Sequence, residues 1–136
     1  MKLSIGNKAS LEKIFSENEV KLFGKISNDT NPIHIDKDYA SQTIFKKPIV
    51  HGMLAASLFG GLLGSKLPGK GTIYLNQNIK FLKPNFVGEK VIVTIEIIKI
   101  IKEKSIYIFS TKCFNSSNDL TIEGEATIMY KGEFFK

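Results

Sequence analysis

At residues 50–67 the sequence reads VHGMLAASLFGGLLGSKL, which contains most of the longest apolar stretch in the chain. This stretch runs from Ile49 to Gly64, is interrupted by His51 and is rich in glycine. It is shorter than the ~20 residues that a membrane-spanning helix needs. A clear turn signal, PGKG at residues 68–71, follows it. We therefore predict a core helix over residues 50–67 and no membrane span.

Four segments typical of β-strands follow this helix, at residues 73–81, 91–98, 106–114 and 121–128. Apolar and polar side chains alternate along several of them, and β-branched and aromatic residues are frequent. Polar breaks separate the last three segments, and the spacing predicts an antiparallel meander. One apolar helix and four long strands indicate an α+β fold in which the sheet wraps around the helix.

The part of the chain before the apolar helix is predicted to be helical. Residues 17–26 have an amphipathic pattern, with Ser16 as a plausible N-cap and Glu19 as its capping-box partner. Residues 28–32 break this helix, because a residue before proline is pushed toward extended geometry. A short helix is expected over residues 36–41.

Composition narrows the class of protein. The 136 residues predict one domain covering 1–136. The net charge is +6, and every basic residue other than histidine is lysine. Arginine is the preferred side chain for bidentate hydrogen bonds to phosphates and to guanine edges. Its absence therefore argues against a protein that recognises specific nucleic-acid sequences. The lysines form either a solvated surface or a surface that attracts an anionic small molecule.

The number of cysteines indicates which cellular compartment the protein suits. The single cysteine, Cys113, excludes an intramolecular disulfide and fits a reducing environment. The first residues show no charged-then-apolar signal pattern. We therefore expect a cytoplasmic protein.

The stretch DTNPIH at residues 29–34 carries the first chemical signal. It places a carboxylate, Asp29, and an imidazole, His34, on either side of a turn that contains proline. The two side chains can converge on one small substrate as an acid and a base. The same residues also suit a plain turn in which Asp29 and Asn31 bind local backbone amides, so both interpretations stay open.

The start of the apolar helix carries the second signal. The first N–H groups of a helix have no partner within the helix, and glycine at Gly52 lets a ligand approach them closely. A thioester oxygen placed there would be stabilised as negative charge develops. Alternatively, Gly52 only eases the entry into the helix, and His51 contacts backbone. Ala56, Gly60 and Gly64 form a small-residue stripe, which serves either close packing or an acyl chain.

Three blocks of the sequence resemble the MaoC-like (R)-specific enoyl-CoA hydratases of the hydratase-2 type. The small stand-alone members linked to polyhydroxyalkanoate monomer supply look most similar, and the resemblance covers most of the chain. Taken together, the blocks are highly specific. They are DTNPIH at 29–34, PIVHGML at 48–54, and GTIYL at 71–75 leading to FLKP at 81–84 and VGE at 87–89.

The resemblance implies a hot-dog fold, assembly as a dimer or higher homo-oligomer, and reversible syn hydration of trans-2-enoyl-CoA to (R)-3-hydroxyacyl-CoA. It makes Asp29 and His34 the acid/base pair, lets Asn31 support the loop, and assigns the Gly52 amide to the oxyanion hole. No metal or redox cofactor is implied, because a thioester acidifies its own α-carbon, and coenzyme A enters only as part of the substrate. The chain departs from the family pattern at two positions. The family often has glycine where this chain has Asn28, and some relatives have serine where it has Gly60. These departures concern loop positioning and the acyl pocket, for which Ala56 and Gly60 are the candidates.

Two other functions compete with the hydratase. One is a 3-hydroxyacyl-carrier-protein dehydratase of fatty-acid synthesis, which would use the same residues in reverse. The other is a hot-dog protein that binds acyl thioesters without turnover. The pair Asp29 and His34 favours catalysis, because a binding module needs neither residue, and addition across an alkene explains the pair better than thioester hydrolysis does. The sequence leaves the acyl length, the carrier and the direction open; coenzyme A is the expected carrier.

Overall fold

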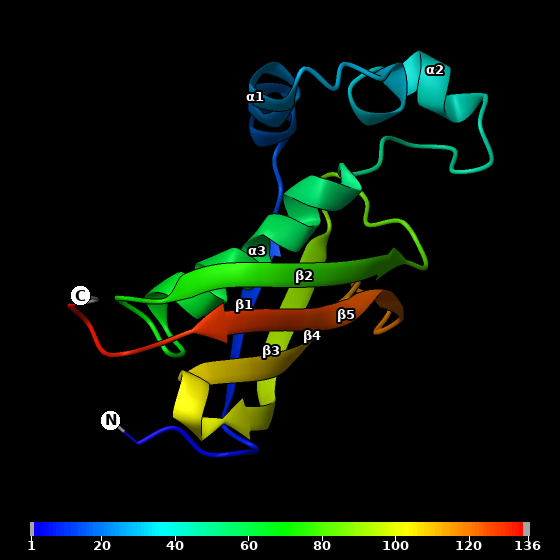
Figure 1. Cartoon of the computed structure of the whole chain (residues 1–136). Coiled ribbons are helices and arrows are strands. Elements are labelled where there is room, and N and C mark those ends of the chain that lie inside the picture. Colours follow the sequence, from blue (N-terminus) through cyan, green and yellow to red (C-terminus); the bar gives the residue numbers. More distant parts are fainter. Residues whose placement is uncertain (1, 135–136) are drawn as a thin grey trace.

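The computed structural model describes residues 2–134 and contains one five-stranded antiparallel sheet curved around a central helix (Figure 1). The strands are β1 Lys8–Ile14, β2 Ile73–Phe81, β3 Lys90–Ile101, β4 Ile106–Phe114 and β5 Leu120–Met129. The helices are α1 Glu17–Ser27, α2 Lys37–Ser41 and α3 Gly52–Ser65, with 3-10 turns η1 Pro32–His34 and η2 Lys102–Lys104. The predicted α+β fold, with the sheet wrapped around the apolar helix, is confirmed.

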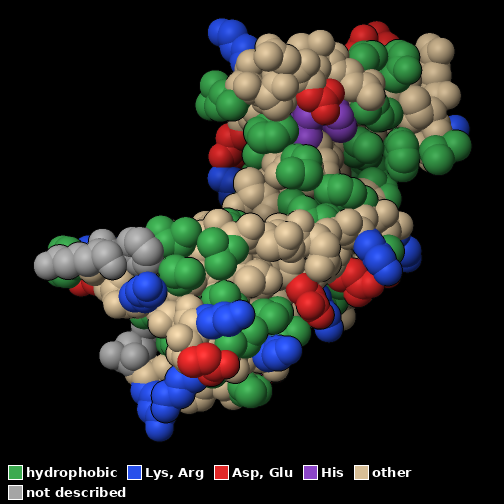
Figure 2. Space-filling view, viewed as in Figure 1, with side chains coloured by type: hydrophobic (Ala, Val, Ile, Leu, Met, Phe, Trp, Pro, Cys, Tyr) green, Lys and Arg blue, Asp and Glu red, His purple; other side chains and the backbone are tan. Residues whose placement is uncertain are grey.

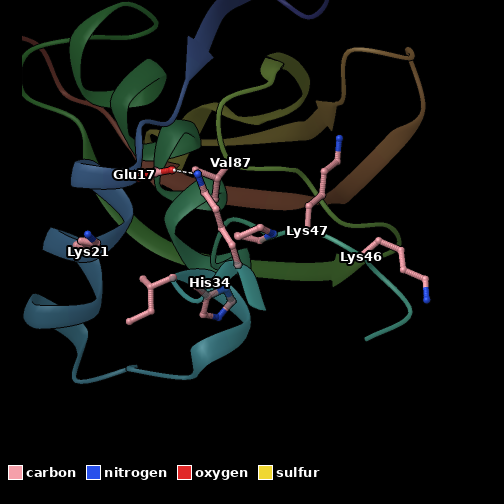
Figure 3. Close-up of a pocket in the computed structure, with 9 residues that line it drawn as sticks. Glu17, Lys21, His34, Lys46, Lys47 and Val87 are labelled. Carbon is pink, nitrogen blue, oxygen red and sulfur yellow. Dashed lines mark ion pairs between the residues drawn. The ribbon is translucent and has the colours of Figure 1, made fainter. Parts of the chain in front are cut away.

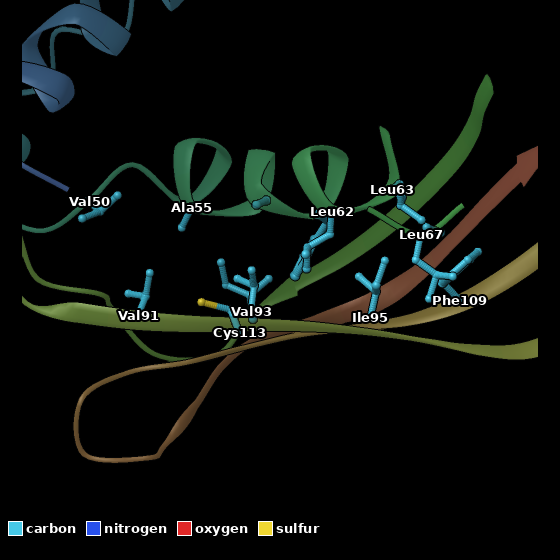
Figure 4. Close-up of a cluster of buried hydrophobic side chains, with 14 of the residues drawn as sticks. Val50, Ala55, Leu62, Leu63, Leu67, Val91, Val93, Ile95, Phe109 and Cys113 are labelled. Atoms are coloured by element: carbon cyan, nitrogen blue, oxygen red, sulfur yellow. The ribbon is translucent and has the colours of Figure 1, made fainter. Parts of the chain in front are cut away.

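The central helix α3 is strongly apolar and buries the face that carries Ala55, Phe59 and Leu62, whereas Met53 and Ser57 are exposed. Its buried side chains pack on the inner face of the sheet, mainly against β3, and share one core cluster with side chains of β4 and β5 (Figure 4). Fully burying a side chain such as Leu62 or Phe59 contributes about 1.5–3 kcal/mol. The prediction of a core helix is correct, although α3 begins two residues later than expected. Among residues 2–134, no helix is long and apolar enough to cross a bilayer.

The strand count and the strand order differ from the sequence prediction. The observed order is β1-β3-β4-β5-β2, so only β3, β4 and β5 form a meander. Strand β1 was missed because its side chains alternate only between exposed and half-buried positions. It is an edge strand that pairs with β3, far away in the chain. Strand β2 lies beside β5 rather than beside β3, because the loop after it carries the chain to the other side of the sheet.

Helix α1 starts and ends at the positions that its capping chemistry dictates. The Glu19 N–H donates to Ser16 Oγ at 3.1 Å, and the Ser16 N–H donates to Glu19 Oε1 at 3.0 Å, which completes the predicted capping box. At the other end Asn28 adopts a left-handed conformation with φ of 62°. This reversal leads the chain into the Asp29 loop. The segment from α1 to α2 stands away from the sheet, over the start of α3 (Figure 1).

Candidate active site

The loop that carries Asp29 is held by its own side chains. The Asn31 N–H donates to Asp29 Oδ1 at 3.3 Å, and the Ile33 N–H donates to Asn31 Oδ1 at 3.2 Å. Asn31 thereby caps η1, where Pro32 is favoured because it needs no N–H partner. The predicted turn chemistry is present, and it leaves Asp29 Oδ2 directed toward His34 at 4.0 Å from Nε2.

The tautomer of His34 follows from its one hydrogen bond. The ring contacts the Ile49 carbonyl through Nδ1 at 2.7 Å. A carbonyl only accepts, so Nδ1 carries the proton and Nε2 of the neutral ring has a free lone pair. The side chain of His34 is only 10% exposed, whereas that of Asp29 is 49% exposed. The structure thus brings the two residues together, with the unprotonated nitrogen facing the carboxylate across a gap too wide for a direct hydrogen bond.

The surroundings of His34 favour its neutral form. Burial is the main cause that lowers the pKa of this imidazole below its ordinary value of 6.5, and the positive potential of His51 lowers it further. The hydrogen bond to Ile49 and the charge of Asp29 act in the opposite direction and only partly offset these effects. His34 can therefore accept a proton at neutral pH.

Acidification should lower both activity and stability. Because the pKa of His34 is lower in the folded state, the unfolded chain binds a proton first as the pH falls through 6.5. The free energy of unfolding should then decrease until the folded-state pKa is passed. The specificity constant should fall only as the pH approaches the lowered folded-state pKa, below 6.5, because protonated Nε2 cannot act as a base. Denaturant titrations and initial rates between about pH 5 and 8 test this. His34→Gln should flatten the stability profile, and activity that rises on acidification would contradict the prediction.

Gly52 is the first residue of α3. Ala55 donates to the His51 carbonyl at 3.1 Å, so the N–H groups of residues 52–54 precede the first helical hydrogen bond. A Cβ added at Gly52 would lie 2.6 Å from the Phe81 ring. Glycine is thus needed for the close approach of Phe81 at the end of β2, a contact that the sequence did not indicate.

Three neighbouring cavities surround these residues. Asp29 and Gly52 line one of about 430 Å³, together with Phe45, Phe81, Asn85 and Ile122. His34 lines a second, of about 320 Å³, whose walls carry several lysines (Figure 3). Ala56 and Gly60 line a third of about 480 Å³, between α3 and β2, which shares Met53 with the first. The two acyl-pocket candidates therefore lie beside the Asp29–Gly52 cavity rather than in it.

Figure 2 shows histidine atoms beside an acidic side chain in the helical segment that stands above the sheet. Asp29, His34 and His51 offer ligand atoms within 4.8 Å of one another. The two imidazole rings are stacked at 3.8 Å with an interplanar angle of 26°. The lone pairs of stacked rings lie in two nearly parallel planes, and one metal ion does not lie in both planes, so this arrangement suits proton transfer better than metal coordination.

Comparisons with known proteins agree on the family. The MaoC like domain model matches residues 4–117. The chain is 46% identical to an (R)-specific enoyl-CoA hydratase of Aeromonas caviae over 93% of this chain and 94% of the relative. It is 34% identical to a mitochondrial 3-hydroxyacyl-[acyl-carrier-protein] dehydratase of Arabidopsis thaliana, over 92% of this chain and 76% of that protein.

A solved structure supports the same assignment. The (R)-hydratase from A. caviae involved in PHA biosynthesis superposes with a TM-score of 0.94 at 45% sequence identity, covering 95% of this chain and 98% of that chain. The sheet, the central helix and the helical segment above it therefore follow one shared architecture. The chain belongs to the MaoC-like family of hot-dog hydratases and dehydratases.

Proposed function

We propose that this protein is an (R)-specific enoyl-CoA hydratase, a hydro-lyase that adds water reversibly to trans-2-enoyl-CoA. The observation that carries the proposal is the Asp29–His34 pair, in which an unprotonated Nε2 faces a carboxylate at 4.0 Å. The similarity to the A. caviae hydratase extends over nearly the whole of both chains. Substrate and product are therefore a 2-enoyl thioester and an (R)-3-hydroxyacyl thioester.

The geometry suggests how the reaction proceeds. In the hydration direction, the Asp29–His34 pair removes one proton from water as its oxygen bonds to the β-carbon, and it delivers one proton to the α-carbon. By resemblance to the (R)-specific hydratases, the two additions occur on the same face of the alkene. The N–H of Gly52 stabilises the negative charge that develops on the thioester oxygen. The thioester acidifies its own α-carbon, so the proposed reaction needs no metal or redox cofactor.

The loss of the enoyl absorbance of crotonyl-CoA on adding pure protein tests the proposal directly. Chiral analysis of the product should give only the (R)-3-hydroxyacyl-CoA. A dehydratase acting on carrier-protein thioesters is the second candidate, supported by the similarity to the Arabidopsis dehydratase. A protein that binds the thioester without converting it would show binding with unchanged absorbance. We further propose a cytoplasmic location, which suits the free, buried thiol of Cys113.

The lysine-lined cavity supports coenzyme A as the carrier. Four lysines and one glutamate line it next to His34 (Figure 3). Lys37 pairs with Glu17 at 3.0 Å, and Lys47 pairs with Glu89. Lys46 has no ion pair within residues 2–134. The surplus of positive charge attracts the phosphates of coenzyme A, and it acts over ~8–10 Å at ordinary salt.

Neutralising this charge should weaken the binding of crotonyl-CoA without slowing the chemistry. We expect Lys21→Gln combined with Lys46→Gln to raise KM severalfold at unchanged kcat, and added salt to do the same to the parent protein. The matched control is Lys102→Gln with Lys104→Gln on η2, at the far end of the sheet (Figure 1). A specificity constant at least tenfold higher for the same acyl chain on a carrier protein would overturn the choice of carrier.

We also propose that the protein is a homodimer. Within residues 2–134, strand β2 pairs only with β5, so its other edge is free of a partner strand there. Several large apolar side chains on or next to this strand are exposed, namely Ile73, Tyr74, Leu75, Phe81 and Leu82. An open strand edge with apolar side chains is a template for pairing with a second copy. A symmetric pair is the commonest assembly.

A charge on this edge should break the dimer. Light scattering of the parent protein should give twice the mass of one chain at micromolar concentration, and Leu75→Lys should shift the mass toward one chain because it buries a charge. Ile98→Lys, at a comparably exposed position on β3, is the matched control and should leave the mass unchanged. A parent protein that is active and monomeric at this concentration would contradict the proposal.

A further inference from the structure

His51 is almost completely buried, at 2% exposure, yet it is only half satisfied. Its Nε2 lies 3.1 Å from the Asp29 carbonyl oxygen. Because that oxygen only accepts, Nε2 carries the proton and Nδ1 holds the lone pair. Nδ1 is buried without a hydrogen-bond partner in the part of the chain that the structure describes. An unpaired buried acceptor costs about 1–3 kcal/mol, so stability alone does not account for a histidine here.

The imidazole of His51 lies between the loop that carries Asp29 and His34 and the start of α3 at Gly52. It stacks on the ring of His34 with centroids 3.8 Å apart, and its edge meets Phe23 of α1 at 4.9 Å. Along the chain it is directly followed by Gly52, whose N–H opens α3. His51 therefore contacts the ring of the base and the backbone of the acid, and it directly precedes the oxyanion donor in the chain.

The Asp29 carbonyl is fixed from two sides. Helix α1 comes so close to it that a Cβ added at the buried Gly24 would lie 3.1 Å from this oxygen. The Nε2–H of His51 holds it in place. The side chain of Asp29 is half exposed, so this backbone anchor and the Asx turn are what limit its movement. At the helix start, by contrast, His51 makes no side-chain capping bond.

We propose that His51 is a positioning residue. Its Nε2–H bond to the Asp29 carbonyl and its stacking on His34 fix the position of the acid/base pair relative to the start of α3. This role rests on the proposed hydratase function, but the hydrogen-bond arrangement itself can be tested without any substrate. The donor is the more important contact, because it fixes the backbone from which the carboxylate extends.

Two substitutions separate the donor from the ring. His51→Phe keeps an aromatic ring on His34 but removes the donor, and His51→Gln keeps an N–H donor but removes the ring. We expect His51→Phe to lower kcat for crotonyl-CoA by about 10–100-fold, because small displacements of catalytic groups have effects of this order. KM should stay within about twofold, and Tm should stay close to the parental value, because removing the unpaired Nδ1 offsets the loss of the Nε2–H bond. His51→Gln should recover part of the lost kcat.

The outcomes that would overturn the proposal are distinct. The first is a parental kcat for His51→Phe. The second is that kcat and Tm fall together in both variants and that kcat does not recover in His51→Gln. Long-range ¹H–¹⁵N spectra of the parent protein should show opposite neutral tautomers, with the proton on Nδ1 of His34 and on Nε2 of His51. If the parent protein failed to hydrate crotonyl-CoA, the proposed function would be wrong. The spectra would still show which nitrogen of His51 carries the proton. A proton on Nδ1 of His51 would overturn the proposed arrangement.

Discussion

Replacing His34 with glutamine, or Asp29 with asparagine, should lower kcat for crotonyl-CoA by about 10²–10⁴-fold while the protein stays folded. His34→Gln removes the lone pair at Nε2 that faces the carboxylate. Asp29→Asn removes the charge but keeps an oxygen for the Asn31 N–H, so the turn survives. Initial rates with crotonyl-CoA, circular dichroism and thermal melting of each variant provide the measurement.

Both substitutions should change the free energy of unfolding only slightly. Asp29 is half exposed, and substitutions at such positions usually change the free energy of unfolding by only a few tenths of a kcal/mol, about ±0.5. His34 loses one hydrogen bond, which contributes about 0.5–1.5 kcal/mol. Asp36→Asn is the matched control, because this carboxylate likewise accepts a local backbone N–H, that of Tyr39 at the start of α2, and asparagine caps a helix equally well. Near-parental turnover in both active-site variants would refute the assignment.

Features that depend on neighbours in the chain could be predicted from the sequence. The capping box of Ser16 and Glu19 starts α1 as expected, and Asn31 caps η1 within the same six-residue stretch that holds the acid and the base. Asp29 and His34 were identified together because both belong to one short loop. The turn brings these two residues near each other, whereas the hydrogen bond of His34 Nδ1 to the distant Ile49 carbonyl orients the ring for the approach to 4.0 Å.

Features that depend on distant partners could not be predicted in this way. Strand β1 has little apolar signal of its own and forms because Ala9 pairs with Ile95. The bond between His51 and the Asp29 carbonyl joins residues on either side of the α2 segment. The approach of Phe81 to Gly52 depends on where β2 ends after it has crossed the sheet beside β5. In each case the tertiary arrangement, and not local propensity, brings the residues together.

Removing the N–H of Gly52 should be the second most damaging change, with kcat lower by about 10²–10³-fold if this group stabilises the thioester oxygen. A simple Gly52→Val test is confounded, because any Cβ here would lie 2.6 Å from the Phe81 ring. We therefore expect the informative comparison in a Phe81→Ala background, where the ring is absent. Gly52→Ala in that background keeps the N–H, and Gly52→Pro removes it.

Proline suits this position for structural reasons. Gly52 is the first residue of α3, where proline is favoured because the N–H has no helical partner. The preceding residue, His51, is outside the α region, and its ψ of 132° lies in the range that a residue before proline favours. Circular dichroism and Tm of the two double variants should therefore agree, while kcat for crotonyl-CoA should differ by the full 10²–10³-fold or so. Equal turnover of the alanine and proline variants would mean that the stabilising donor lies elsewhere, because the proline variant has no N–H at this position.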